Sequence, residues 1–90
     1  MLNWRECKDA YGELQFITDD INAEVYVCEN QYIVDRNVQG DTNYLPWHFC
    51  IRWWNEGVNY DIYTEIGYKT KEEAIQFVET IVEKHGLKKE

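Results

Sequence analysis

The sequence predicts an α+β fold: a short N-terminal helix, an antiparallel meander of four to five strands, and a long C-terminal amphipathic helix packed on one face of the sheet. Three observations predict it. Side chains alternate with period two between residues 13 and 66, a T-x-x-E capping pattern precedes an apolar stripe near the C-terminus, and an N-x-x-E pattern opens the chain. Residues 1–90 are expected to form a single domain, because compact domains commonly have this length.

The first residues suit a short helix. Asn3 fits the N-cap position, and Glu6 stands three residues later, as in a capping box. An apolar stripe at positions i, i+3 and i+7 follows, formed by Trp4, Cys7 and Tyr11. Gly12 is a natural place for this helix to stop.

Three candidate strands come next, at residues 13–18, 23–29 and 31–38. The turn-rich D-D-I-N stretch separates the first two. Glu29 and Asn30 are few enough for a tight hairpin between the second and the third. The longest loop then leads to residue 46.

The next two strands carry three of the four tryptophans. In the first of them the core side is predicted to hold Trp47, Phe49, Ile51 and Trp53, and the opposite side His48, Cys50, Arg52 and Trp54. The N-E-G stretch fits a three-residue hairpin loop with Gly57 at a left-handed position. The return strand then places Val58, Tyr60, Ile62 and Ile66 on the core side and Asn59, Asp61, Tyr63 and Glu65 opposite.

The C-terminal helix has both of its ends marked in the sequence. Thr70 and Glu73 form the capping box at its start. His85 in the last turn suits the negative end of the helix dipole, and Gly86 ends the helix. The predicted buried stripe consists of Ala74, Phe77, Val78, Ile81 and Val82.

Charge and composition limit the classes of partner. Seventeen Asp and Glu face nine Lys and Arg, a net charge of −8. Such a surface repels nucleic-acid backbones and anionic membranes, and it attracts a basic surface on another protein. The alternative reading of this charge is plain solubility. The sequence also lacks a membrane-spanning run, an apolar signal core and paired cysteines, so a cytoplasmic location is expected, in the host cell if the chain is phage-encoded.

The sequence offers no constellation for catalysis, a metal or a cofactor, and none is expected. It has no serine. His48 and Cys50 lie two apart on one strand, about 6–7 Å between side chains, which is too far for a nucleophile and its base. Cys28 is a candidate neighbour across the sheet, but the spacing of the three does not match a zinc site.

The sheet face opposite the core is predicted to be a mixed aromatic and acidic surface. The candidate partner-binding residues on it are Trp54, Tyr63, Asp61, Glu65, Asp35 and Arg52, with Trp54 as the anchor. Two other interpretations stay open. These aromatic residues pair across strands on a solvated face, or the N-terminal helix covers part of the face with Trp4 and Tyr11.

The first functional hypothesis is a small acidic, non-enzymatic inhibitor of the kind that phages and mobile elements encode. It would dock on a host defence or nucleic-acid-handling protein, with carboxylates where phosphates would sit. The alternative is a small-ligand or nucleotide-binding, sequestering module that acts as a homo-oligomer and uses His48, Arg52, Trp54 and Tyr63. A third hypothesis is an assembly subunit whose exposed aromatic residues close a homodimer.

Overall fold

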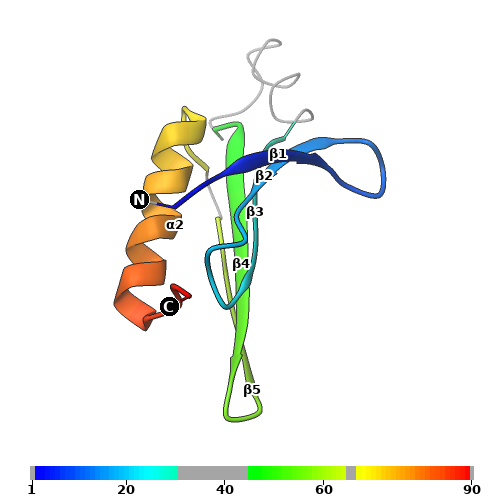
Figure 1. Cartoon of the computed structure of the whole chain (residues 1–90). Helices are drawn as coiled ribbons and strands as arrows, with labels where there is room; N and C mark the ends of the chain where they lie inside the picture. The colour runs from blue at the N-terminus through cyan, green and yellow to red at the C-terminus, as the bar shows by residue number, and fades with distance from the viewer. Residues whose placement is uncertain (1, 31–44, 65–66, 90) are drawn as a thin grey trace.

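In the described part of the chain, five strands form one sheet, and a helix covers one face of it. The computed structural model describes residues 2–30, 45–64 and 67–89. Its elements are β1 (Arg5–Lys8), β2 (Leu14–Ile17), β3 (Glu24–Glu29), β4 (Trp47–Asn55), β5 (Val58–Tyr63) and α2 (Lys71–His85). The strands form one antiparallel sheet in sequence order, and α2 lies along one face of it (Figure 1). The predicted α+β class, the meander and the C-terminal helix are therefore confirmed, but the predicted N-terminal helix is wrong.

The core lies between the sheet and α2, where the alternation of the strands predicts it. On β4, Phe49, Ile51 and Trp53 are buried, whereas Arg52 and Trp54 between and beyond them are exposed. Side chains from β2, the turn after it, β3, α2 and the segments near both termini complete this core; its buried members are Leu2, Phe16, Ile21, Val25, Val27, Phe49, Ile51, Trp53, Ala74, Val78, Ile81, Val82 and Leu87. Burial of this apolar surface is the main force that holds α2 on the sheet.

The capping signals of α2 act as predicted. The side chain of Thr70 accepts a hydrogen bond of 3.2 Å from the backbone N–H of Glu73, and Gly86 ends the helix in the left-handed conformation. One residue of the predicted stripe differs. Phe77 is 45% exposed, with its ring 5.6 Å from that of Phe49 and 5.8 Å from that of Tyr68.

The hairpin of β4 and β5 projects beyond the end of α2 (Figure 1). Its loop is one residue shorter than predicted, because Asn55 pairs directly with Val58. Glu56 and Gly57 have φ angles of 52° and 80°, as a type I′ turn requires. Val58 was expected on the core side but is 51% exposed, since the helix does not reach the tip of the hairpin.

The N-terminal segment is an edge strand because its backbone pairs with β2. Cys7 lies opposite Gln15, and the whole of β1 follows the same antiparallel register. The expected helical stripe is dispersed: Trp4 packs against the core, whereas Tyr11 is 91% exposed in the loop after β1. No helix among the described residues covers the other face of the sheet, so the interpretation in which Trp4 and Tyr11 cover it is wrong.

The loop between β1 and β2 closes on the side chain of Asp9. Its Oδ1 accepts hydrogen bonds from the backbone N–H groups of Tyr11, at 2.8 Å, and Glu13, at 3.0 Å. The backbone carbonyl of Asp9 accepts from the N–H of Gly12 at 3.1 Å. Gly12, with φ of 81°, is therefore a hairpin residue and not a helix stop.

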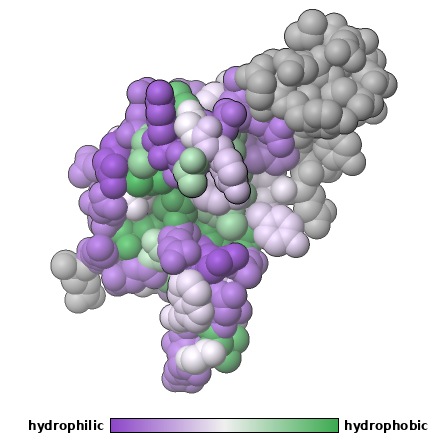
Figure 2. Space-filling model, turned by 90° about the vertical axis from the view of Figure 1, so that its right-hand side faces the viewer, coloured by the Kyte–Doolittle hydropathy of each residue, from purple (hydrophilic) through white to green (hydrophobic). Residues whose placement is uncertain are grey.

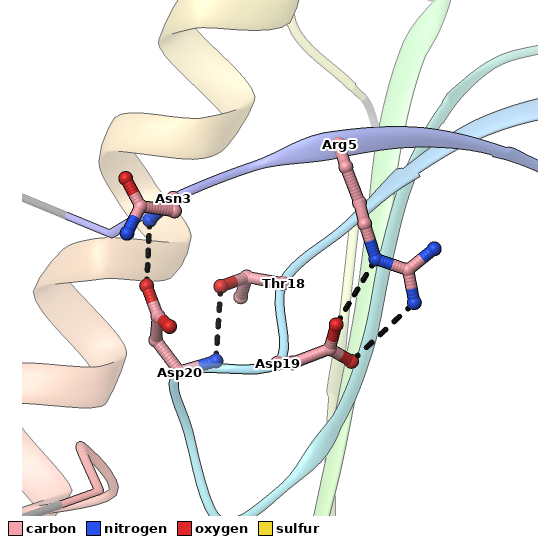
Figure 3. Close-up of polar contacts among 5 residues, drawn as sticks. All are labelled: Asn3, Arg5, Thr18, Asp19 and Asp20. Carbon is pink, nitrogen blue, oxygen red and sulfur yellow. Dashed lines mark hydrogen bonds and ion pairs between the residues drawn. The ribbon is translucent and has the colours of Figure 1, made fainter.

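The turn after β2 holds the start of the chain in place (Figure 3). A carboxylate oxygen of Asp20 accepts a hydrogen bond of 2.7 Å from the backbone N–H of Asn3, and Asp19 pairs with Arg5 at 3.0 Å. The hydroxyl oxygen of Thr18, a buried residue, accepts from the N–H of Asp20 at 3.2 Å and shapes the turn. The backbone of Asn3 is thus bonded to the turn after β2, and Asn3 does not cap a helix as predicted.

Candidate functional site

The face of the sheet opposite α2 carries the candidate site, and we call it the open face. It is viewed directly in Figure 2, where hydrophobic surface gathers in a hollow near the middle and hydrophilic residues border it. The β1–β2 hairpin projects from the sheet on this side (Figure 1). The open face is therefore bordered at one end by the β1–β2 hairpin, and it continues along β4 and β5 to the tip of their hairpin.

Cross-strand pairing arranges the open face in rows. Residues that are paired across an antiparallel sheet point to the same side, and the rows are spaced by two residues along each strand. Toward the β4–β5 turn, the rows are Cys28–His48, Tyr26–Cys50–Tyr63, Glu24–Arg52–Asp61 and Trp54–Asn59. The face thus alternates between an aromatic row, a charged row and a second aromatic row.

The charged row is internally paired. Arg52 Nε lies 2.6 Å from Asp61 Oδ1, and the side-chain amide of Asn59 donates a hydrogen bond of 3.3 Å to Asp61 Oδ2. The hydrogen bond to Asp61 is the largest of the effects that raise the pKa of Arg52. This row therefore presents a nearly neutral ion pair, and Glu24, the Cα partner of Arg52, adds negative charge beside it.

The two aromatic rows present large exposed rings. Trp54 is 56% exposed, Tyr63 is 65% exposed and Tyr26 is 42% exposed. Trp54 pairs with Asn59, four residues before Tyr63, so the backbone positions that carry these two rings are about 13 Å apart along the strand. They cannot stack on one small ring system together, but they can contact separate parts of a larger partner.

The cysteines and the histidine of the open face are half-buried and lie side by side. Cys28 pairs with His48 across the sheet, as the sequence suggested, and Cys50 lies between Tyr26 and Tyr63. His48 Nε2 is 3.0 Å from the carbonyl oxygen of Leu45. Because a carbonyl only accepts, this contact assigns the proton to Nε2.

Both thiols resist ionisation. Burial is the main cause that raises the pKa of Cys28, and the charges of Asp9 and Glu13 raise it further. Burial also raises the pKa of Cys50. Activated cysteines need the opposite shift. Since the folded-state pKa values lie above the ordinary thiol value of 9.0, the contribution of these thiols to stability is complete below that pH and is lost as the pH rises through the shifted values.

A hollow of about 480 Å³ lies between the β1–β2 hairpin and β3. Three acidic residues, Asp9, Glu13 and Glu29, are among the residues that line it, together with Tyr26 and Cys28. Sequence reasoning missed this feature, because the assignment of residues 3–12 to a helix hid the hairpin. The D-x-x-G spacing of Asp9 and Gly12, typical of a type I turn, was the available signal.

A larger hollow, of about 600 Å³, lies on the other side of the molecule, beside the C-terminal half of α2. Leu2, Glu79 and Lys88 are among its lining residues. Glu79 already accepts a hydrogen bond of 3.0 Å from the backbone N–H of Leu2. This hollow therefore marks where the start of the chain is fastened to the helix.

The structure places four of the six candidate partner-binding residues, Trp54, Tyr63, Asp61 and Arg52, on the open face. Asp35 and Glu65 lie outside the described residues, as do the predicted strand at residues 31–38 and the end of the return strand at residues 65–66. The residues of the alternative ligand site are on this face too. His48 is six residues from Trp54 on β4, or about 20 Å, so they do not form one small pocket.

Among residues 2–30, 45–64 and 67–89, no group of three His, Cys, Asp or Glu residues is placed to hold a metal ion, and no helix is long and apolar enough to cross a membrane. In comparisons with known proteins, no family model matches the chain, nor does any curated protein or solved structure. The residues of the open face are therefore the basis for assigning a function to this chain.

Proposed function

We propose that this chain is a small acidic binding protein that acts by docking on a protein partner and not by catalysis. The observation that carries the proposal is the open face, on which large exposed rings lie beside acidic residues and a hollow adjoins the β1–β2 hairpin. The partner class that fits is a basic protein surface. We further propose that the chain is an inhibitor of the kind that phages and mobile elements encode, acting in the host cytoplasm on a defence or nucleic-acid-handling protein.

Exposed aromatic residues supply most of the binding energy in this proposal. Trp and Tyr bury large areas with few rotatable bonds and are enriched at binding hot spots. Trp54 and Tyr63 stand on strands whose other face is anchored in the core. Because their backbone is held by the sheet, little conformational freedom is lost when a partner covers them.

The acidic residues supply attraction and orientation. Asp61 is neutralised by Arg52, so the carboxylates that act on a partner are Glu24, on β3, and Asp9 and Glu13 beside the hollow. In a nucleic-acid-binding groove these carboxylates would occupy phosphate positions. Complementary charge of this kind chiefly raises the association rate and makes it sensitive to salt.

The same contacts weigh against the nucleotide-binding alternative. A phosphate needs a free cation or a set of donors, and the guanidinium of Arg52 is held by Asp61. His48 is engaged with Leu45, and acidic residues line the nearby hollow. These observations support a protein partner more than an anionic ligand.

Paired variants test the proposal. The wild-type chain captures its partner from the native host, and mass spectrometry identifies it. We expect Trp54→Ala with Tyr63→Ala to weaken the measured affinity by about tenfold or more, as loss of an aromatic anchor does. We expect Glu24→Lys with Glu13→Lys to slow association and to reduce its dependence on salt.

The matched control is Glu72→Lys with Glu83→Lys, which changes the net charge equally on exposed positions of α2. It should leave the affinity near that of the wild type. The proposal is wrong if the open-face variants bind as the wild type does, or if the helix variants lose binding to the same degree. Cooperative thermal melts of each variant show whether the fold is intact.

A further inference from the structure

The register of the β4–β5 hairpin determines which residues of β5 direct their backbone N–H and C=O groups toward β4 and which direct them outward. The two-residue loop makes Asn55 and Val58 the first hydrogen-bonded pair of the hairpin, and such pairs alternate with non-hydrogen-bonded ones. The bond of 3.1 Å from the N–H of Thr64 to the carbonyl of Phe49 agrees with this phase. The backbone groups of the residues between, Asn59, Asp61 and Tyr63, therefore point away from β4.

These outward groups face no other strand in the described part of the chain, because β5 is last in the order of the sheet. Exposed strand edges recruit further strands unless charge, proline or a bulge protects them. The edge strand β1 is protected in this way, since three of its four residues are charged. By contrast β5 has six residues and one charge, Asp61, which is already paired with Arg52 in its own sheet.

We propose that β5 pairs with β5 of a second copy of this chain, antiparallel and edge to edge. The favoured register places Tyr60 opposite Tyr60 of the second copy. Asn59 of one copy then lies opposite Asp61 of the other, and their outward backbone groups form hydrogen bonds with each other. Val58 of one copy lies opposite Ile62 of the other. Each contact is complementary, with apolar side chains opposite apolar ones and an amide opposite the carboxylate.

Other registers that also pair the outward backbone groups of the two copies give less favourable side-chain contacts. A shift that centres the pair on Asp61 places two carboxylates directly opposite each other, which destabilises a sheet. A shift that centres it on Asn59 leaves Ile62 and Tyr63 without a partner strand. The sequence of β5 is thus self-complementary in one register, and this selects a second copy as the occupant of the edge.

The ring stacking of the hairpin supports the same register. The ring of Tyr60 stacks on that of Trp53, with centroids 5.5 Å apart and planes inclined by 14°. Tyr60 is still 42% exposed, and Val58 beside it on the same face is 51% exposed. Pairing would cover both and extend the stack across the two-fold axis from one Trp53 to the other.

The two-fold axis of such a pair stands perpendicular to the sheet. Both copies of α2 would lie on one side, and both open faces would lie on the other as a continuous surface across ten strands. The inference does not depend on the proposed function, because the open face can dock on a partner with or without edge pairing.

Cysteine scanning tests the register. Directly opposed residues of a non-hydrogen-bonded pair have Cα atoms about 4.5 Å apart, within the range of a disulfide. Under mild oxidation we expect Tyr60→Cys to form a covalent dimer linked at position 60, as peptide mass spectrometry would show. Asn59→Cys and Asp61→Cys should not exceed the wild type, whose native cysteines set the background.

Sedimentation equilibrium tests the assembly itself. We expect the wild type to approach twice the chain mass of 10.9 kDa as its concentration rises. Asn59→Pro removes an outward N–H without breaking the β4 ladder, so it should give a folded monomer. The inference fails if the wild type stays monomeric up to millimolar concentration, if Asn59→Pro dimerises equally, or if cross-linking at position 59 or 61 exceeds that at 60. Should Asn59→Pro not fold, the cross-linking result decides.

Discussion

Gly67 lies where the segment after β5 passes the first residues of β4. The two segments exchange hydrogen bonds between Trp47 and Tyr68, at 3.0 and 2.8 Å. A Cβ atom on Gly67 would press against the carbonyl oxygen of Leu45 and come within 3.0 Å of His48 Nε2. The φ angle of Gly67 is 102°, which disfavours any other residue. Close approach and backbone conformation therefore require glycine here.

We expect Gly67→Ala to lower the free energy of unfolding by about 3 kcal/mol, the combined cost of the φ angle and the displaced backbone. Gly12→Ala is the matched control, with φ of 81° and no atom within 4 Å of the added Cβ. It should cost about 1 kcal/mol. Urea denaturation measures both. Equal losses would mean that the approach to Leu45 relaxes and does not constrain the fold.

The alternation of side chains along each strand was enough to predict which residues lie on the open face, but not which residues they pair with. Period two placed Arg52 and Trp54 on the correct side of β4. Their partners depend on register, which the length of the hairpin loop sets. A three-residue loop would pair Trp54 with Val58, although the alternation assigns these two residues to opposite faces of the sheet. The alternation of the two strands was therefore consistent only with the two-residue loop that the structure has.

At the scale of elements, the difference between the two ends of the chain has a physical cause. The signals for α2 are contained within it, because the cap of Thr70 and the end at Gly86 are satisfied by its own backbone. The conformation of β1 is decided by β2 and by the turn after it, which accepts from Asn3 and pairs with Arg5. With only four residues, three of them charged, β1 shows too little alternation for the sequence to indicate a strand, so the N-x-x-E capping pattern led to the prediction of a helix.

The N-cap of α2 contributes a measurable share of stability. Removal of the Thr70 hydroxyl leaves the N–H of Glu73 without its acceptor, so Thr70→Ala should lower the free energy of unfolding by about 1 kcal/mol. Thr80→Ala is the control. Its hydroxyl donates to the carbonyl of Gln76 inside the helix, and its loss should change stability by less than about 0.5 kcal/mol. If chemical denaturation shows the same loss for both, the cap bond is not what stabilises the start of α2.

At the scale of the whole molecule, both ends of the chain are fastened to the turn between β2 and β3. The N–H of Lys89 donates to the carbonyl of Asp20 at 2.8 Å, and the N–H of Asn22 donates to the carbonyl of Leu87 at 2.7 Å. The carboxylate of Asp20 also holds Asn3. The turn that the sequence marks only as polar thus joins the first strand, the sheet and the segment after the helix.

Leu87 is the apolar part of this junction and is only 7% exposed. Leu87→Ala keeps the backbone bonds but leaves a cavity under the end of α2, so we expect it to lower the free energy of unfolding by about 3 kcal/mol. Leu14→Ala makes the same change at a side chain that is 47% exposed and should cost less than about 1 kcal/mol. Thermal and urea unfolding of the two variants measure the difference. If they lose the same amount, the backbone bonds alone fasten the C-terminal segment. If Leu87→Ala loses more, burial of this side chain closes the sheet, the helix and the N-terminus into one cooperative unit.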